Sequence, residues 1–229
     1  MNGDAFSFTL NGTHGLALPS GALFLPTEDL LCVSDLHLAK SERMARRRGV
    51  MLPPYETRAA LDRLAQDIAL TKPAAVVALG DSFDDIQASE SLDREDRITL
   101  ARLQEGRRWV WIEGNHDAGS HAHGGEGCDE FTAAGLTFRH IAEPDAAPGE
   151  VSGHYHPKYG PPGLGDRRPC FLLDARRLIL PAYGTYTGGL DAREPVLRSL
   201  FADRALAVLT GGRAVPIPLP AARRRARNA

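Results

Sequence analysis

Length, composition and charge limit what this chain can be. Its 229 residues, 43% of them hydrophobic, are enough for one large domain, and no linker divides them. The formal net charge of −2 gives no overall sign of a polyanion-binding protein, and basic residues cluster only locally, at 46–48 and 223–227. We therefore expect a single domain over residues 1–229, ending in a disordered basic tail at 221–229.

The first half of the chain alternates strand and helix patterns. In chain order the predicted elements are antiparallel strands within 5–35, a polar and basic loop at 38–52, a helix opened by Pro53-Pro54, a strand at 74–79, a helix at 92–104 and a strand at 109–112. Short apolar runs that follow crossover helices are typical of buried parallel strands. Residues 118–127 are rich in Gly and His and predict a mobile loop, with His121 and His123 exposed to solvent.

The second half is richer in strand patterns with tight connections. The candidate strands are 136–140, 150–153, 169–173, 178–181, 205–209 and 214–219. A strand–helix half followed by a strand-rich half predicts an α/β fold, a layered αββα sandwich in which two mixed sheets face each other with helices outside. Loops at the strand ends would then converge at one edge.

Residues of metal-ligand type follow the predicted strands. Asp35-x-His37 follows the apolar run at 30–33, and side chains two apart in an extended chain point to the same side. Taken alone, an Asp after a strand is more often a turn or helix cap. Similar groups recur at later strand ends, namely Gly80-Asp81-x-x-Asp84, Gly114-Asn115-His116-Asp117, His140 and Gly153-His154-Tyr155-His156. This recurrence favours a shared metal site.

In this order the motifs resemble those of the calcineurin-like metallophosphoesterase superfamily, over roughly residues 30–156. The resemblance implies two metal ions that share Asp81 as a bridging ligand. By the same resemblance, the first ion is held by Asp35, His37, Asp81 and His156, and the second by Asp81, Asn115, His140 and His154. Imidazole, carboxylate and amide ligands without thiolate suit divalent Mn²⁺, with Fe or Zn²⁺ as alternatives. The assignment of His140 rests on the resemblance, because a histidine at a strand end is ordinarily a core or rim residue.

Two divalent ions beside two carboxylates leave a positive site for a phosphoryl group. A water that bridges both ions would ionise near neutral pH and attack phosphorus as hydroxide, while the ions stabilise the developing charge. The resemblance implies that His116 protonates the leaving alkoxide, with Asp84 holding its imidazole. A helix cap or a partner of a ligand is the better interpretation of Asp117.

Longer segments resemble the bacterial ligase-associated DNA damage response endonucleases of that superfamily. The segments are 34–42, 47–49, 79–83, 152–158 and 180–190. This resemblance implies DNA as the substrate and a DNA ligase and a helicase as partners. The basic loop that contains Lys40, Arg43 and residues 46–48 directly follows the first ligand pair, so it is placed to hold a nucleic-acid backbone. A solvated run of charge is the alternative interpretation.

Three functions remain open from the sequence. A metal-dependent phosphodiesterase that acts as a repair-associated DNA endonuclease is favoured. The alternative is a hydrolase of small nucleotides or phosphomonoesters, because the same metal core cleaves either ester. A non-catalytic scaffold on this fold is less favoured, because every ligand and His116 are present. The sequence shows no aromatic stacking platform near the site, so strand preference is open.

Cysteine usage and hydropathy bear on the compartment. Cys32, Cys128 and Cys170 are odd in number and have no Cys-x-x-Cys spacing, which argues against a disulfide framework and a zinc–thiolate site. No stretch approaches the length of a membrane span, and no basic segment followed by an apolar core opens the chain. We expect a soluble cytoplasmic protein with no membrane partner.

Overall fold

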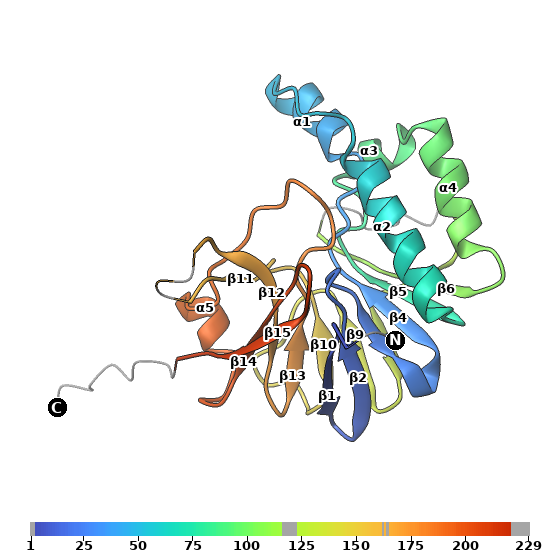
Figure 1. The fold of residues 1–229 in the computed structure, drawn as a ribbon. Helices are drawn as coiled ribbons and strands as arrows, with labels where there is room; N and C mark the ends of the chain where they lie inside the picture. Colours follow the sequence, from blue (N-terminus) through green and yellow to red (C-terminus); the bar gives the residue numbers. More distant parts are fainter. Residues whose placement is uncertain (1–2, 116–122, 162, 164, 221–229) are drawn as a thin grey trace.

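Two β-sheets form the centre of the molecule (Figure 1). The computed structural model describes residues 3–115, 123–161, 163 and 165–220, so the predicted tail at 221–229 lies outside the described residues. The first sheet has the order β1-β2-β3-β4-β5-β6-β7. Its strands are β1 (Phe6–Leu10), β2 (Thr13–Ala17), β3 (Leu23–Leu25), β4 (Leu30–Val33), β5 (Ala75–Leu79), β6 (Arg108–Ile112) and β7 (Glu126–Cys128).

The second sheet has the order β15-β14-β12-β13-β10-β9-β8, with β11 paired to β12 at its side. Its strands are β8 (Glu130–Ala133), β9 (Leu136–Arg139), β10 (Glu150–Ser152), β11 (Lys158–Tyr159), β12 (Arg168–Leu173), β13 (Arg177–Ile179), β14 (Leu206–Leu209) and β15 (Val215–Pro218). Both sheets are mixed, because the parallel groups β4-β5-β6-β7 and β9-β10-β13 each adjoin antiparallel strands.

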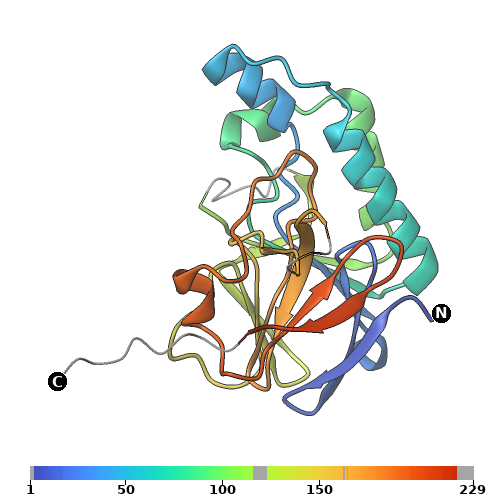
Figure 2. The ribbon, with the colours of Figure 1, turned by 60° about the vertical axis from the view of Figure 1, so that its left-hand side comes forward.

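The helices lie outside the two sheets, as Figures 1 and 2 show. They are α1 (Lys40–Arg48), α2 (Glu56–Thr71), α3 (Ile86–Glu90), α4 (Arg94–Gln104), α5 (Pro195–Arg198) and the 3-10 turn η1 (Pro26–Glu28). Within the described ranges, no helix is both long and apolar enough to cross a membrane.

Alternation of side chains along the strands divides the core into layers. In β4, Leu31 and Val33 pack in one apolar cluster with α2 and α4, whereas Leu30 and Cys32 pack in another that includes Phe138 and Phe171 of the second sheet. A third cluster joins the outer face of the second sheet to α5. The predicted αββα sandwich is therefore confirmed, with the second outer layer reduced to one short helix.

Most predicted strands and helices occur at the expected places. The segment after Leu38 is the main exception, because the predicted loop at 38–52 contains α1. Ion pairs from α1 to Asp84 and Asp85, which are distant in sequence, hold this helix in place, and local sequence patterns do not reveal them. The predicted mobile loop is also wrong in part, because residues 126 and 127 belong to β7. Residues 118–122 of that loop lie outside the described residues.

The topology brings the candidate ligands to one end of the sandwich. The strands β4, β5 and β6 are parallel neighbours, so their carboxyl ends meet at one edge of the sheet. The segments that follow these strands, 34–38, 80–85 and 113–115, therefore start at the same edge. In the second sheet β9 and β10 are also parallel, and His140 and His154 follow their ends. Ligand sites in open α/β sheets commonly lie outside the carboxyl ends of strands.

Candidate metal centre

Two compact clusters of three side chains lie at these strand ends. Asp35, His37 and His156 form the first cluster, and each offers a ligand atom within 4.8 Å of the others. Asp81, His140 and His154 form the second cluster by the same measure. Each cluster combines one carboxylate with two imidazoles, a donor set that suits divalent transition metals.

Ring nitrogens of the first cluster converge on a common point. Nε2 of His37 and Nε2 of His156 are 3.2 Å apart, and the latter is also 3.2 Å from Oδ1 of Asp35. Nδ1 of His37 lies 2.9 Å from Oδ1 of Asp84, which favours the tautomer with its proton on Nδ1 and its Nε2 lone pair directed into the cluster. Asp35 is 1% exposed.

The second cluster has the same arrangement. Nδ1 of His140 donates to the carbonyl of Leu79 at 2.8 Å, so its Nε2 carries the lone pair. That atom lies 3.2 Å from Nδ1 of His154 and 3.5 Å from Oδ2 of Asp81. The Nε2 lone pair of His140, the ring of His154 and the carboxylate of Asp81 thus face a common space in which a cation would be coordinated.

Hydrogen bonding of Asp35 tests whether these residues fit a metal. Oδ2 accepts from the hydroxyl of Ser34 and from the backbone N–H of His154 at 2.9 Å. Oδ1 is buried, and within the described ranges it accepts no hydrogen bond; its near neighbour is Nε2 of His156. An unsatisfied buried carboxylate oxygen beside converging imidazoles fits a bound divalent cation.

Buried charge in the clusters shifts several pKa values. Burial acts to raise the pKa of Asp35, yet the nearby imidazoles of His156 and His140 and the Ser34 hydroxyl together lower it. Burial acts to lower the pKa of His140, yet its bond to Asp81 and the charges of Asp35 and Asp81 raise it. Burial and the neighbouring His140 lower the pKa of His154. The field of the two carboxylates therefore favours positive charge between the clusters.

Left-handed backbone conformations concentrate in the candidate site. Five of the six cluster residues have positive φ, the exception being His140. The values are 52° for Asp35, 46° for His37, 46° for Asp81, 72° for His154 and 46° for His156. The expectation that an extended chain aims Asp35 and His37 to the same side is therefore wrong. A turn after β4 brings them together, at a conformational cost typical of functional sites.

Backbone hydrogen bonds hold this turn against the one that follows β5. The N–H of His37 donates to the carbonyl of Asp81 at 2.9 Å, and the N–H of Leu38 donates to Ser82 at 2.9 Å. The N–H of Asp84 donates back to Leu38 at 3.1 Å. The two acidic motifs therefore form one rigid unit.

Two motif glycines permit close approach between the sheets. A Cβ on Gly80 would lie 2.5 Å from Nδ1 of His140, and Gly80 also has a φ of 72°. A Cβ on Gly153 would overlap the hydroxyl of Ser34 and lie 2.7 Å from Oδ2 of Asp35. Any larger residue at either position would push the first and second sheets apart at the clusters.

The third motif is described only in part. Asn115 follows β6 at the predicted edge and is exposed, and its role as a ligand of the second ion stays a prediction. His116, Asp117 and His121 lie outside the described residues. The predicted contact between His116 and Asp84 is therefore untested.

The described partners of Asp84 assign it a task that the sequence did not suggest. Besides Nδ1 of His37, its Oδ1 accepts from Lys40 at 3.3 Å, and its Oδ2 accepts from Arg43 at 2.7 Å. Burial acts to raise the pKa of Asp84, but the bonds from His37 and Arg43 hold it well below its usual range. Asp84 thus stays ionised, orients His37 and joins the site to α1.

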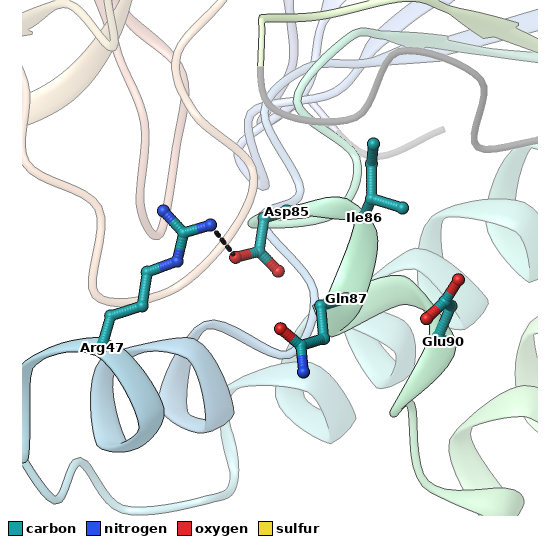
Figure 3. Close-up of a pocket in the computed structure, with 5 residues that line it drawn as sticks. All are labelled: Arg47, Asp85, Ile86, Gln87 and Glu90. Atoms are coloured by element: carbon teal, nitrogen blue, oxygen red, sulfur yellow. Dashed lines mark ion pairs between the residues drawn. The ribbon is translucent and has the colours of Figure 1, made fainter.

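The neighbouring Asp85 binds two further arginines of α1. Arg46 and Arg47 reach its carboxylate at 2.9 and 3.0 Å, and Oδ1 also caps α3 by accepting from the Ala88 N–H at 2.7 Å. Arg47 and Asp85, with Ile86, Gln87 and Glu90, line a pocket of about 470 Å³ (Figure 3). None of the six cluster residues lines this pocket, so it is separate from the candidate metal centre.

The side chain of His123 is half-buried, which corrects the expectation of a solvent-exposed residue. Its ring stacks on Phe83 with centroids 4.7 Å apart, and Nε2 contacts the hydroxyl of Ser89 at 2.8 Å. Phe83 belongs to the turn after β5, so His123 packs against the segment that carries Asp81 and Asp84. It belongs to neither cluster.

Comparison with known proteins agrees with this geometry. The sequence pattern described as calcineurin-like phosphoesterase matches residues 29–170, a range that contains all six cluster residues. The chain belongs to the calcineurin-like phosphoesterase family. The members of this family that act as enzymes hydrolyse phosphoester bonds, and the paired clusters provide a candidate site for two divalent metal ions.

One solved structure places the fold among known proteins. The crystal structure of Pseudomonas putida nuclease MPE is similar over 93% of this chain and 100% of that chain, with a TM-score of 0.74 and 24% sequence identity. This likeness shows a shared fold. No curated protein matches the chain in sequence.

Proposed function

We propose that this chain is a phosphodiesterase that uses two divalent metal ions, with Mn²⁺ as the first choice and Fe or Zn²⁺ as alternatives. The observation that carries the proposal is the pair of clusters, each with one carboxylate and two imidazoles, in a family of phosphoesterases. Asp35, His37 and His156 would hold one ion, and His140, His154 and Asn115 the other, with Asp81 between them. Ions bound there would activate water and stabilise charge on a phosphoryl group.

The chain's own residues have supporting tasks in this proposal. Ser34 and the His154 N–H hold one oxygen of Asp35 so that the other faces the site. Asp84 and the Leu79 carbonyl fix the tautomers of His37 and His140. His116 would give a proton to the leaving alkoxide, because it adjoins Asn115 in the motif and is not itself among the proposed ligands.

We further propose DNA as the substrate, which makes the enzyme a repair-associated endonuclease. The sequence resemblance to ligase-associated endonucleases and the fold shared with a protein named as a nuclease support this. One observation favours a small phosphodiester as the second candidate. Lys40, Arg43, Arg46 and Arg47 are all paired with Asp84 or Asp85, so much of the charge of α1 is already neutralised.

A matrix of metals and substrates tests both candidates. The purified protein is stripped with chelator and supplied with Mn²⁺, Mg²⁺ or Zn²⁺, then offered a bis-aryl phosphodiester, an aryl phosphomonoester, single-stranded DNA and duplex DNA. We expect metal-dependent turnover of the diester and of DNA. Full turnover in excess chelator contradicts the metal proposal, turnover of the monoester alone contradicts a diesterase, and diester cleavage without DNA cleavage favours the small substrate.

The partners remain a separate proposal. Association with a DNA ligase and a helicase follows only from the sequence resemblance. Co-purification of the tagged chain with those two enzymes from its own host would support it, and their absence under conditions that preserve weak complexes would reject it.

A further inference from the structure

The loop between β13 and α5 is attached to the chain on both flanks of the first cluster. At its start, the N–H of Tyr183 donates to the carbonyl of Ser34 at 2.7 Å, and the N–H of Gly184 donates to that of Asp35 at 3.0 Å. Figures 1 and 2 both show this orange loop rising toward α1 and α3. The loop is therefore attached directly to the chain that carries Asp35.

Its far end is attached to the chain that carries His156. The N–H of Leu190 donates to the carbonyl of Tyr155 at 3.3 Å, and Nζ of Lys158 donates to the carbonyl of Thr187 at 3.0 Å. A Cβ on Gly189 would overlap the carbonyl oxygen of His156. Residues 184–189 thus span the two flanks of the cluster formed by Asp35, His37 and His156.

A buried anchor makes the start of the loop rigid. Tyr183 is fully buried, its hydroxyl donates to Oδ2 of Asp67 at 2.8 Å, and the guanidinium of Arg63 lies 4.4 Å above its ring. Asp67 and Arg63 both belong to α2. The loop is therefore fixed at three places: to the chain that follows β4, to the helix α2, and to Tyr155 and Lys158 near β11.

One aromatic side chain on this loop faces solvent. Tyr186 is 46% exposed, and within the described ranges its side chain has no hydrogen-bond or ring partner. Its φ of 55° is left-handed, which for a bulky residue costs about 1–2 kcal/mol. It lies two positions after Gly184, so its Cα lies within about 7.6 Å of that residue's Cα. Stability of the fold does not explain why a strained, exposed ring stands on the loop that joins the two flanks of the first cluster.

We propose that the ring of Tyr186 is a substrate-contacting surface on which an unpaired nucleobase next to the scissile phosphodiester stacks. This rests on the proposed nuclease function and deepens it, because it selects single-stranded over duplex DNA. Stacking suits a residue whose backbone is already fixed, since little entropy is lost on binding. The ammonium of Lys158 beneath the loop adds positive charge near the adjoining phosphate.

The test compares Tyr186→Ala, Tyr186→Phe and wild type on a single-stranded oligonucleotide and on one with abasic sugars in place of its central nucleosides. Fluorescence anisotropy in chelator measures binding without turnover, and kcat/KM in Mn²⁺ measures cleavage. Base stacking of about 1–3 kcal/mol predicts that Tyr186→Ala weakens both by about 5- to 150-fold on the first substrate. We expect little change on the abasic substrate, and near wild-type behaviour for Tyr186→Phe.

Controls separate the inference from the proposed function. Ala keeps the Cβ and hence the same backbone strain, and Tyr55→Ala removes another exposed tyrosine, which lies at the start of α2. Equal losses on both oligonucleotides, equal losses in Tyr55→Ala, or no loss in Tyr186→Ala would each overturn the role of Tyr186 while leaving a nuclease. Wild-type protein that cleaves the bis-aryl diester but neither binds nor cleaves DNA would instead overturn the nuclease proposal and this inference with it.

Discussion

Replacing Asp84 with Asn should weaken metal binding although Asp84 is not among the proposed ligands. Its Oδ1 holds Nδ1 of His37 at 2.9 Å, and its Oδ2 accepts from Arg43 at 2.7 Å, with the carboxylate 1% exposed. His37 and Arg43 approach different oxygens of Asp84, whereas Asn has only one oxygen and can turn it toward His37 or toward Arg43 but not toward both. Its NH₂ group must then face the other donor, either the guanidinium of Arg43 or the imidazole N–H of His37. The proton on His37 is then no longer held by a negative charge.

Removal of a carboxylate that orients a ligand histidine typically lowers metal affinity by about 10- to 100-fold, or about 1.4–2.8 kcal/mol. We expect a loss in this range for one of two binding events when Mn²⁺ is titrated into the chelator-stripped protein by calorimetry. Nitrogen NMR of His37 should show a mixed tautomer in Asp84→Asn, whereas wild type carries its proton on Nδ1.

Asp85→Asn is the matched control for this prediction. Asp85 pairs with Arg46 and Arg47 of α1, the helix that also carries Arg43, but with no residue of either cluster. Asn also preserves the cap of α3. Unchanged affinity in Asp84→Asn would refute the positioning role. An equal loss in Asp85→Asn would show that the docking of α1, rather than the bond to His37, controls the site.

Three further predictions concern the motifs. Asp81→Asn should lose both ions and nearly all activity, because one carboxylate serves two metals; two ions per chain by elemental analysis would contradict the bridging assignment. His116→Ala should keep both ions yet lose about 10²- to 10⁴-fold in turnover of DNA, and less for a phenolate leaving group; equal losses on both esters would reject its role as an acid. Gly153→Ala should cost about 1–3 kcal/mol of unfolding free energy, because the added Cβ would overlap Ser34, whereas Gly212→Ala meets nothing within 4 Å; equal denaturant midpoints would contradict this.

The sequence predicted the layered fold and the residues that meet, for reasons that are local. Apolar runs of strand length and ligand-type residues at their ends are visible without a structure, and parallel strands must end at one edge. The recurrence of ligand-type residues was found in this way, whereas the grouping of His156 with Asp35 and His37 was implied by the family resemblance. The geometry of this cluster was not predicted, because the prediction assumed an extended chain and the structure has left-handed turns.

Features that depend on distant partners could not be read from local patterns. The helix α1 appeared as a basic loop because its residues offer little apolar surface, and it is the pairing of its arginines with Asp84 and Asp85 that fixes it. Asp84 was expected beside His116 on the basis of its motif, whereas its described partners are His37 and α1. The exposed ring of Tyr186 lay within a recognised segment, but only the fold attaches that segment to both flanks of the first cluster.

Backbone strain at the clusters connects folding to metal binding. Each left-handed Asp or His costs about 1–2 kcal/mol, and five of the six cluster residues carry this cost. Hydrogen bonds between the turns after β4 and β5, and from the His154 N–H to Asp35, hold these conformations in place. The imidazole lone pairs and carboxylate oxygens that result face one another, which is unfavourable until a cation lies between them. The fold therefore prepares ligand geometry in advance, and metal ions bound there would offset part of the strain.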